Sequence, residues 1–139
     1  MTKILFSSSE LETENTAFSL AKNQTIKPND IVALRGDLGA GKTAFTRGLV
    51  RFFSPGARVT SPTFSLVNQY KNIFHFDMYR INSEEDLLSV GFYDYLCGEG
   101  LIIIEWFDNI AAFFDEYTIK IDIEKLDGDK RKIYVDTRC

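Results

Sequence analysis

Eight consecutive residues, Gly36–Thr43, have the types and spacing of a phosphate-binding P-loop. Their sequence is GDLGAGKT, which fits the pattern G-x-x-x-x-G-K-[ST]. Glycines allow the backbone N–H groups of such a loop to turn toward phosphate oxygens. Lys42 supplies a mobile positive charge for the outer phosphates, and the Thr43 hydroxyl can bind Mg²⁺. The segment therefore predicts a nucleotide site. The alternative is a glycine-rich turn that binds no ligand.

The residues on either side of the loop form the setting in which this motif binds nucleotide. Residues 30–35 are a short apolar run that predicts a buried strand. Residues 44–53 carry apolar side chains at helical spacing and predict a helix, whose N-terminus favours bound phosphate. The positions expected to contact the nucleotide are Gly36, Asp37, Leu38, Gly39, Ala40, Gly41, Lys42 and Thr43.

A P-loop nucleotidase also needs an acidic side chain opposite the P-loop threonine to complete the Mg²⁺ shell. Two carboxylates qualify, because Glu105 ends the apolar run 101–104 and Asp77 ends the run 73–76. If both point at the site, they need a cation to offset their mutual repulsion. The alternative is that each is a solvated acid at the end of a strand.

Two other features lie where they can act on a nucleotide. Thr60–Thr63 stands between the P-loop helix and the next strand, where a switch loop can order around the γ-phosphate. An ordinary loop fixed by Pro62 is the alternative. Trp106 follows Glu105 and can stack on a base or pack against a neighbouring loop. The guanine-binding N-K-x-D signature is absent from the sequence, which favours ATP over GTP.

The chain has a single histidine, His75. Alternation along its strand places it on the same face as Asp77, opposite Phe74 and Phe76. It can tune the Asp77 carboxylate, but a structural histidine is the preferred interpretation.

The order of apolar and polar patterns predicts an α/β fold. The expected strands are residues 2–6, 30–35, 64–70, 73–79, 101–104, 117–123 and 130–135, and helices are expected at about 10–23, from 44 and from 84. The continuous apolar run 101–104 predicts a central strand buried on both faces. Residues 64–79 and 117–135 each predict an antiparallel hairpin. The side chains available for the inner face of the first helix are Leu11, Phe18, Leu20 and Ala21. We therefore expect a P-loop NTPase-like mixed sheet with a parallel core flanked by helices, plus antiparallel hairpins.

Length and composition limit the remaining possibilities. The 139 residues suffice for one domain with its own core, and a single domain over residues 1–139 is expected. A net charge of −4 argues against a surface that grips nucleic acid alone. No run approaches the ~18 apolar residues of a membrane span. Two cysteines, Cys97 and Cys139, form no disulfide framework or zinc site; Cys97 is expected in or near the core. A cytoplasmic location fits best.

Four stretches together resemble one family, the bacterial TsaE (formerly YjeE) ATPases that serve threonylcarbamoyladenosine modification of tRNA. The resemblance covers nearly the whole chain and is carried by residues 35–43, 59–70, 75–80 and 104–106. The P-loop alone is generic, whereas Thr-Ser-Pro-Thr-Phe followed by His-Phe-Asp-x-Tyr-Arg is far more specific.

The resemblance implies ATP and Mg²⁺ as cofactors and gives several residues a role. Thr43 and Glu105 correspond to the metal ligands, and Asp77 to a second essential acid that arranges water. With Lys42, these two acids are the expected catalytic residues. Thr63 belongs to the switch-like loop and, like Trp106, is expected at the nucleotide. The resemblance also places the helix start, around residues 12–16, near the adenine.

The resemblance further implies two protein partners, TsaD and TsaB, with tRNA reached only through their complex. The expected function is a slow Mg²⁺-dependent ATPase that acts as a partner-dependent switch. Two other functions stay open, a P-loop small-molecule kinase and a non-catalytic nucleotide-binding module. Spacing assigns no arginine finger; the candidates are Arg47, Arg51, Arg58, Arg80 and Arg131.

Overall fold

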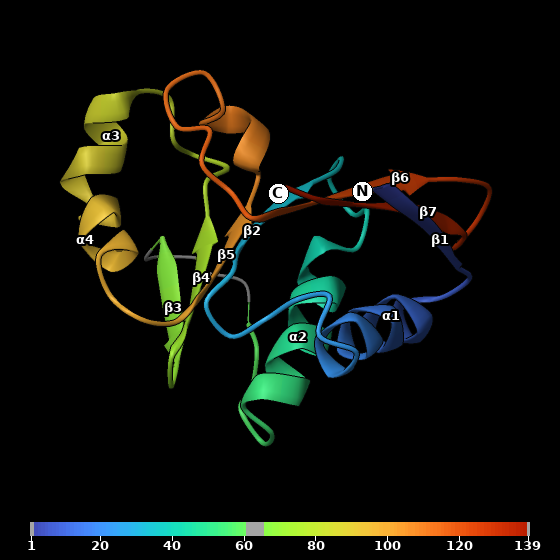
Figure 1. The fold of residues 1–139 in the computed structure, drawn as a ribbon. Helices are drawn as coiled ribbons and strands as arrows, with labels where there is room; N and C mark the ends of the chain where they lie inside the picture. Colours follow the sequence, from blue (N-terminus) through green and yellow to red (C-terminus); the bar gives the residue numbers. More distant parts are fainter. Residues whose placement is uncertain (1, 61–65, 139) are drawn as a thin grey trace.

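A seven-stranded sheet with helices on both faces forms the fold in the computed structural model (Figure 1). The structure describes residues 2–60 and 66–138. The strands are β1 (Thr2–Ser7), β2 (Ile31–Arg35), β3 (Val67–Tyr70), β4 (Ile73–Asp77), β5 (Leu101–Glu105), β6 (Ile119–Lys125) and β7 (Arg131–Thr137). The helices are α1 (Glu10–Lys22), α2 (Lys42–Phe53), α3 (Glu84–Ser89), α4 (Phe92–Leu96) and the 3₁₀ helix η1 (Phe107–Asn109).

The order of strands across the sheet is β1-β7-β6-β2-β5-β4-β3. The central four strands, β6, β2, β5 and β4, run parallel to one another, while β7, β1 and β3 add antiparallel pairs at the two sides. The predicted mixed sheet with a parallel core and two hairpins is therefore confirmed. The pairing of β1 with β7, which brings Thr2 opposite Asp136, was not predicted.

Two layers of helices bury the two faces of this sheet. Figure 1 shows α1 and α2 on one side and α3 and α4 on the other. The first layer packs on a core that includes Leu34, Leu49 and Ile103, and the second on a core that includes Phe92 and Ile104. All five residues of β5 are buried, as the continuous apolar run predicts.

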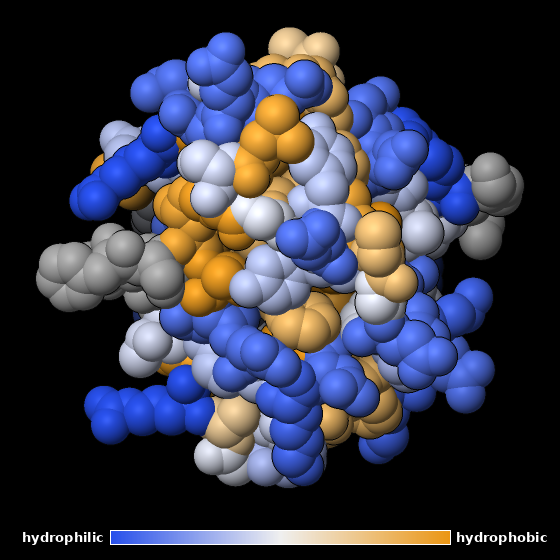
Figure 2. Space-filling view, turned by 90° about the vertical axis from the view of Figure 1, so that its left-hand side faces the viewer, coloured by the Kyte–Doolittle hydropathy of each residue, from blue (hydrophilic) through white to orange (hydrophobic). Residues whose placement is uncertain are grey.

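The surface on the side of α3 and α4 is mainly hydrophilic, with hydrophobic side chains between the polar ones (Figure 2). Leu88 of α3 is one of the exposed hydrophobic residues of the molecule. Cys97, which follows α4, is exposed, so its expected place in or near the core is wrong. Within the part of the chain that the structure describes, no helix is long and apolar enough to cross a membrane.

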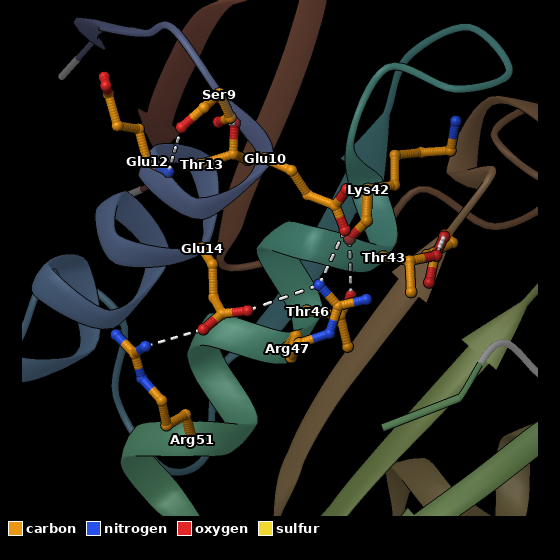
Figure 3. Close-up of polar contacts among 11 residues, drawn as sticks. Ser9, Glu10, Glu12, Thr13, Glu14, Lys42, Thr43, Thr46, Arg47 and Arg51 are labelled. Carbon is orange, nitrogen blue, oxygen red and sulfur yellow. Dashed lines mark hydrogen bonds and ion pairs between the residues drawn. The ribbon is translucent and has the colours of Figure 1, made fainter. Parts of the chain in front are cut away.

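Helices α1 and α2 lie side by side and are joined by ion pairs (Figure 3). Arg47 of α2 reaches Glu10 at 3.0 Å and Glu14 at 3.5 Å, and Arg51 reaches Glu14 at 2.7 Å. Helix α1 begins after Ser9, whose Oγ accepts from the Glu12 N–H at 3.1 Å. These contacts fix the start of α1 relative to α2, which is the helix that follows the P-loop.

The inner face of α1 differs from the expected one at Leu11, which is 61% exposed. The buried side chains of this helix are Thr13, Ala17, Leu20 and Ala21. Small residues face α2 because the two helix backbones approach closely at Gly48, where a Cβ atom would lie 2.0 Å from the Glu14 carbonyl oxygen. Leu11 lies nine residues before Leu20, about half a turn from it around the helix, so it points to solvent.

Candidate nucleotide site

The parallel strands bring three predicted elements together at their carboxyl ends. β2 leads into the P-loop, β5 ends at Glu105 and β4 ends at Asp77. Asp77 and Glu105 are paired residues in the β4–β5 register, so their side chains leave the sheet on one face. The carboxyl ends of adjacent parallel strands are the place where α/β proteins bind ligands.

A cavity of about 450 Å³ lies at this edge. It is lined by Ser9, Glu10, Thr13, Leu38, Gly39, Ala40, Gly41, Lys42, Thr43, Ala44, Asp77, Glu105, Trp106, Asp129 and Arg131. Of the residues expected to contact nucleotide, Gly36 and Asp37 lie outside it and line a neighbouring hollow. Thr63 and the rest of 61–65 lie outside the described residues, so the predicted role of that loop stays a prediction.

The P-loop backbone passes close to strand β6 at its first glycine. A Cβ atom on Gly36 would lie 2.7 Å from the Ile123 carbonyl oxygen, so a larger residue would displace the loop. The Ala40 N–H donates to the Asp37 carbonyl oxygen at 3.0 Å, closing a turn before α2 begins. Gly36 therefore contributes through packing of the loop.

Lys42 is held against the loop and against Trp106. Its Nζ donates to the carbonyl oxygens of Gly36 at 2.6 Å and Asp37 at 2.9 Å, and lies 4.0 Å from the centre of the Trp106 ring. The residue is 5% exposed. Burial lowers the pKa of Lys42, and the nearby Glu105 carboxylate partly opposes this. A phosphate in the cavity would add negative charge beside this buried ammonium.

Trp106 takes up its position through an unusual backbone conformation. Its φ is 58°, in the left-handed region that a bulky residue rarely adopts. The ring contacts Tyr79 at 4.8 Å between centroids and lines the cavity beside Lys42. Such strain is often found at functional sites. Trp106 thus packs against its neighbours and also faces the cavity, so both sequence interpretations remain compatible with its place.

The Glu105 carboxylate lies between α2 and β4. Its Oε1 accepts from the Thr43 hydroxyl at 3.4 Å, and its Oε2 is bonded to His75 Nε2. Thr43 and Glu105 are thus brought together as expected of two ligands of one metal ion. His75 bonds to Glu105, whereas the sequence had suggested Asp77 as the carboxylate it could tune.

Asp77 is half-buried beside this pair. Its Oδ1 accepts from the Tyr79 N–H at 2.9 Å, which orients the carboxylate. Burial raises the pKa of Asp77, with the nearby Glu105 adding to the effect, while the Tyr79 hydrogen bond, His75 and Lys42 oppose it. A carboxylate of raised pKa is a better proton acceptor than a solvated one.

The raised pKa leads to a prediction about stability. It means that ionising Asp77 disfavours the folded protein, so this cost is absent below pH 3.8 and grows as the pH rises through the pKa of the folded state. We therefore expect Asp77→Asn to raise the melting temperature at pH 7 and to leave it unchanged below pH 3.8. Thermal unfolding of the nucleotide-free protein at pH 7 and below pH 3.8 measures it.

The matched control is Asp127→Asn, since Asp127 is exposed in the turn between β6 and β7 and is expected to leave the melting temperature unchanged. The prediction would be contradicted by a lower melting temperature for Asp77→Asn at pH 7, or by an equal rise in melting temperature at acid pH. Either result would show that the ionised carboxylate does not destabilise the folded protein.

Sequence reasoning did not assign the residues on the outer walls of the cavity. Ser9, Glu10 and Thr13 reach it from the start of α1, close to the segment expected near the adenine, whereas Glu12 and Thr16 line a separate hollow beside β1. From β7, Arg131 donates through Nε to the Ala40 carbonyl oxygen at 2.9 Å. The hairpin of β6 and β7 was predicted, but its place beside the P-loop depends on the parallel pairing of β6 with β2, for which spacing gives no signal.

The donor set fits Mg²⁺ bound together with phosphate. Hydroxyl and carboxylate oxygens are the ligands Mg²⁺ prefers, and protein sites usually supply one or two carboxylates while phosphates and water supply the rest. Thr43 and Glu105 would hold the ion, with Asp77 beside them. Among residues 2–60 and 66–138, no group of three His, Cys, Asp or Glu side chains is placed to hold a metal ion alone.

Comparison with known proteins agrees on one family. The sequence profile described as "Threonylcarbamoyl adenosine biosynthesis protein TsaE" matches residues 7–133. A protein of Rickettsia typhi named "tRNA threonylcarbamoyladenosine biosynthesis protein TsaE" is 45% identical over 128 residues, 88% of this chain and 87% of that protein. The Bacillus subtilis protein of the same name is 34% identical over 111 residues, 77% of this chain and 69% of its own.

A solved structure has the same fold. The crystal structure of Bacillus subtilis YdiB superposes with a TM-score of 0.76 at 26% sequence identity, covering 99% of this chain and 86% of that one. Profile, relatives and structure all extend over most of the chain, P-loop and strand-end acids included. The chain belongs to the TsaE family.

Proposed function

We propose that the chain is a Mg²⁺-dependent ATPase that supports threonylcarbamoylation of adenosine in tRNA, and that it acts as a nucleotide switch on a complex of TsaD and TsaB. The names of its relatives support the role in tRNA modification. ATPase activity is best supported by one observation. The Thr43 hydroxyl oxygen and Glu105 Oε1 lie 3.4 Å apart beside the P-loop lysine in one cavity.

The residues divide the work of phosphoryl transfer among them. Backbone N–H groups of the P-loop hold the phosphates, and the N-terminus of α2 favours their negative charge. Lys42 lies at the same wall of the cavity and can extend a hydrogen bond to an outer phosphate. When bound, Mg²⁺ neutralises charge that develops on the phosphoryl oxygens. Thr43 and Glu105 hold it in place.

Asp77 is the residue proposed to orient the attacking water. Its Oδ1 is fixed by the Tyr79 N–H, and the carboxylate lines the cavity opposite the P-loop. Burial raises the pKa of this carboxyl group, which favours acceptance of a proton from water. Catalysis of this kind depends on positioning and on charge stabilisation.

Slow turnover in isolation is part of the proposal. Among the described residues, the arginine that lines the cavity is Arg131, and its guanidinium donates to the carbonyl oxygens of Gly39 and Ala40. Arg47 and Arg51 are paired with acids of α1. An arginine finger supplied by a partner typically raises the rate of nucleotide hydrolysis about 10³–10⁵-fold.

The test is release of phosphate from MgATP by the purified chain, alone and with TsaD and TsaB from the same organism. We expect slow hydrolysis alone, a rise of about tenfold or more with the partners, and a loss of about 10²-fold or more in Thr43→Ala. Thr46→Ala is the matched control, because Thr46 lies one turn further along α2 and its hydroxyl donates to the Lys42 carbonyl oxygen.

Three results would contradict the proposal. Rapid hydrolysis by the chain alone would remove the need for a partner. Hydrolysis that survives Thr43→Ala would place the chemistry elsewhere. Tight nucleotide binding without hydrolysis in any mixture would favour a non-catalytic module, or a kinase if phosphate moved to a small metabolite.

A further inference from the structure

We propose that His75 is a positioning residue that holds the Glu105 carboxylate in the orientation needed to bind Mg²⁺. The inference rests on the proposed function, in which Glu105 is a metal ligand. It changes the interpretation of His75, which the sequence alone presents as a structural histidine of β4.

The contact between the two side chains is buried and directed. His75 is 0% exposed and Glu105 is 4% exposed. His75 Nε2 is bonded to Glu105 Oε2. An ionised carboxylate only accepts hydrogen bonds, so in this contact Nε2 acts as the donor. This bond therefore selects the tautomer and the ring orientation of His75.

The second ring nitrogen of His75 gives no separate reason for a histidine at this position. His75 Nδ1 is buried and has no hydrogen-bond partner among the described residues. Buried polar atoms in proteins nearly always have partners, and an exception calls for an explanation. A phenylalanine or leucine would fill a purely structural position without this cost. The bond to Glu105 explains why a histidine stands there.

The two carboxylate oxygens of Glu105 therefore have different contacts. Oε2 accepts from His75 of β4, while Oε1 faces the Thr43 hydroxyl of α2. Contacts from two elements on opposite sides fix the plane of the carboxylate. A metal ligand held in this way loses less freedom when it binds the ion, and removing such an outer partner typically costs about 10–100-fold in metal affinity.

Tyr70 of β3 keeps the histidine ring in place from the other side. Its ring stacks on His75 with centroids 6.4 Å apart and an interplanar angle of 29°. The Tyr70 hydroxyl accepts from the Thr60 N–H at 3.2 Å. The His75 ring thus contacts both Tyr70 and Glu105, which limits its rotation.

The test measures ADP binding in saturating Mg²⁺ and in EDTA. Trp106 is the only tryptophan of the chain and lines the cavity, so its fluorescence reports the titration. We expect His75→Leu to reduce the Mg²⁺-dependent gain in ADP affinity by about tenfold or more, while affinity in EDTA changes by less than about twofold. His75→Gln keeps an N–H donor and is expected to restore most of the gain.

Phe76→Leu is the control for a purely structural effect, because Phe76 is buried in the same strand on the opposite face. A Mg²⁺-dependent gain that survives in His75→Leu would overturn the proposal. So would an equal loss of affinity in Mg²⁺ and in EDTA, or the same selective loss in Phe76→Leu. If the wild-type protein itself shows no gain from Mg²⁺, the proposed metal ligation fails, a different result from failure at His75 alone.

A second measurement needs no nucleotide or metal. In metal-free protein, the denaturant midpoints of His75→Leu, Glu105→Gln and the double variant form a cycle. Strongly non-additive shifts are expected for two side chains in buried contact. Additive shifts would overturn the pairing on which the proposal depends.

Discussion

Replacing Gly48 with alanine is expected to lower the free energy of unfolding by about 3 kcal/mol, at the upper end of what overpacking usually costs. An added Cβ would lie 2.0 Å from the Glu14 carbonyl oxygen and 2.8 Å from the Ala17 Cβ. Both are parts of α1, so relief requires the two helices to separate. Alanine gains about 1 kcal/mol over glycine in helix propensity, which is too little to offset the clash.

Separation of the helices would also reach the nucleotide site. The start of α1 contributes Ser9, Glu10 and Thr13 to the cavity, while α2 begins at Lys42. A shift of one helix relative to the other would change the shape of the cavity wall that the two helices form together. We therefore expect weaker ADP binding by Gly48→Ala in addition to the loss of stability measured by urea denaturation.

The control is Gly98→Ala, where the added Cβ would meet its nearest neighbour, the Tyr95 carbonyl oxygen, at 3.9 Å. A change within about 0.5 kcal/mol is expected there, as for other surface substitutions. If Gly48→Ala proved as stable as the wild type, the close approach of α1 and α2 would not describe the protein in solution.

Patterns within one segment predicted the elements of this fold well. The apolar run 101–104 indicated a strand buried on both faces, and β5 is that strand. A helix was expected from residue 84, and Ser83 caps α3 by accepting from the Asp86 N–H at 3.2 Å. Each signal depends on residues a few positions apart, whose geometry is set by the local backbone.

Contacts between distant segments were harder to predict. Leu11 was expected inside, but it lies about opposite Leu20 around α1, and which face is buried is decided by packing on other elements. Likewise, alternation placed His75 on the correct face of β4. Only the register that pairs Asp77 with Glu105 brings His75 within reach of the Glu105 carboxylate. Register between parallel strands is set by the whole sheet and has no short signature.

Replacing Lys42 with methionine is expected to weaken ATP binding by about 10–100-fold, because hydrogen bonds from charged groups contribute about 1.5–3 kcal/mol each. Hydrolysis should fall by about 10²-fold or more, since the charge at the outer phosphates is lost in the transition state as well. Methionine keeps the length of the side chain, and its thioether can pack against the Trp106 ring. Trp106 fluorescence during ATP titration, together with phosphate release, measures both effects.

The thermal stability of the nucleotide-free Lys42→Met protein should rise or stay the same, so weaker ATP binding can be distinguished from misfolding. Burial lowers the pKa of Lys42, so the charged ammonium is a cost to the nucleotide-free fold even though it donates to two loop carbonyls. Without nucleotide, Lys42→Met is expected to unfold at the wild-type temperature or above, while stabilisation by added ATP disappears. Lys22→Met, at the exposed end of α1, should retain both properties. A Lys42→Met protein that ATP still stabilises fully would show that Lys42 does not hold the phosphates.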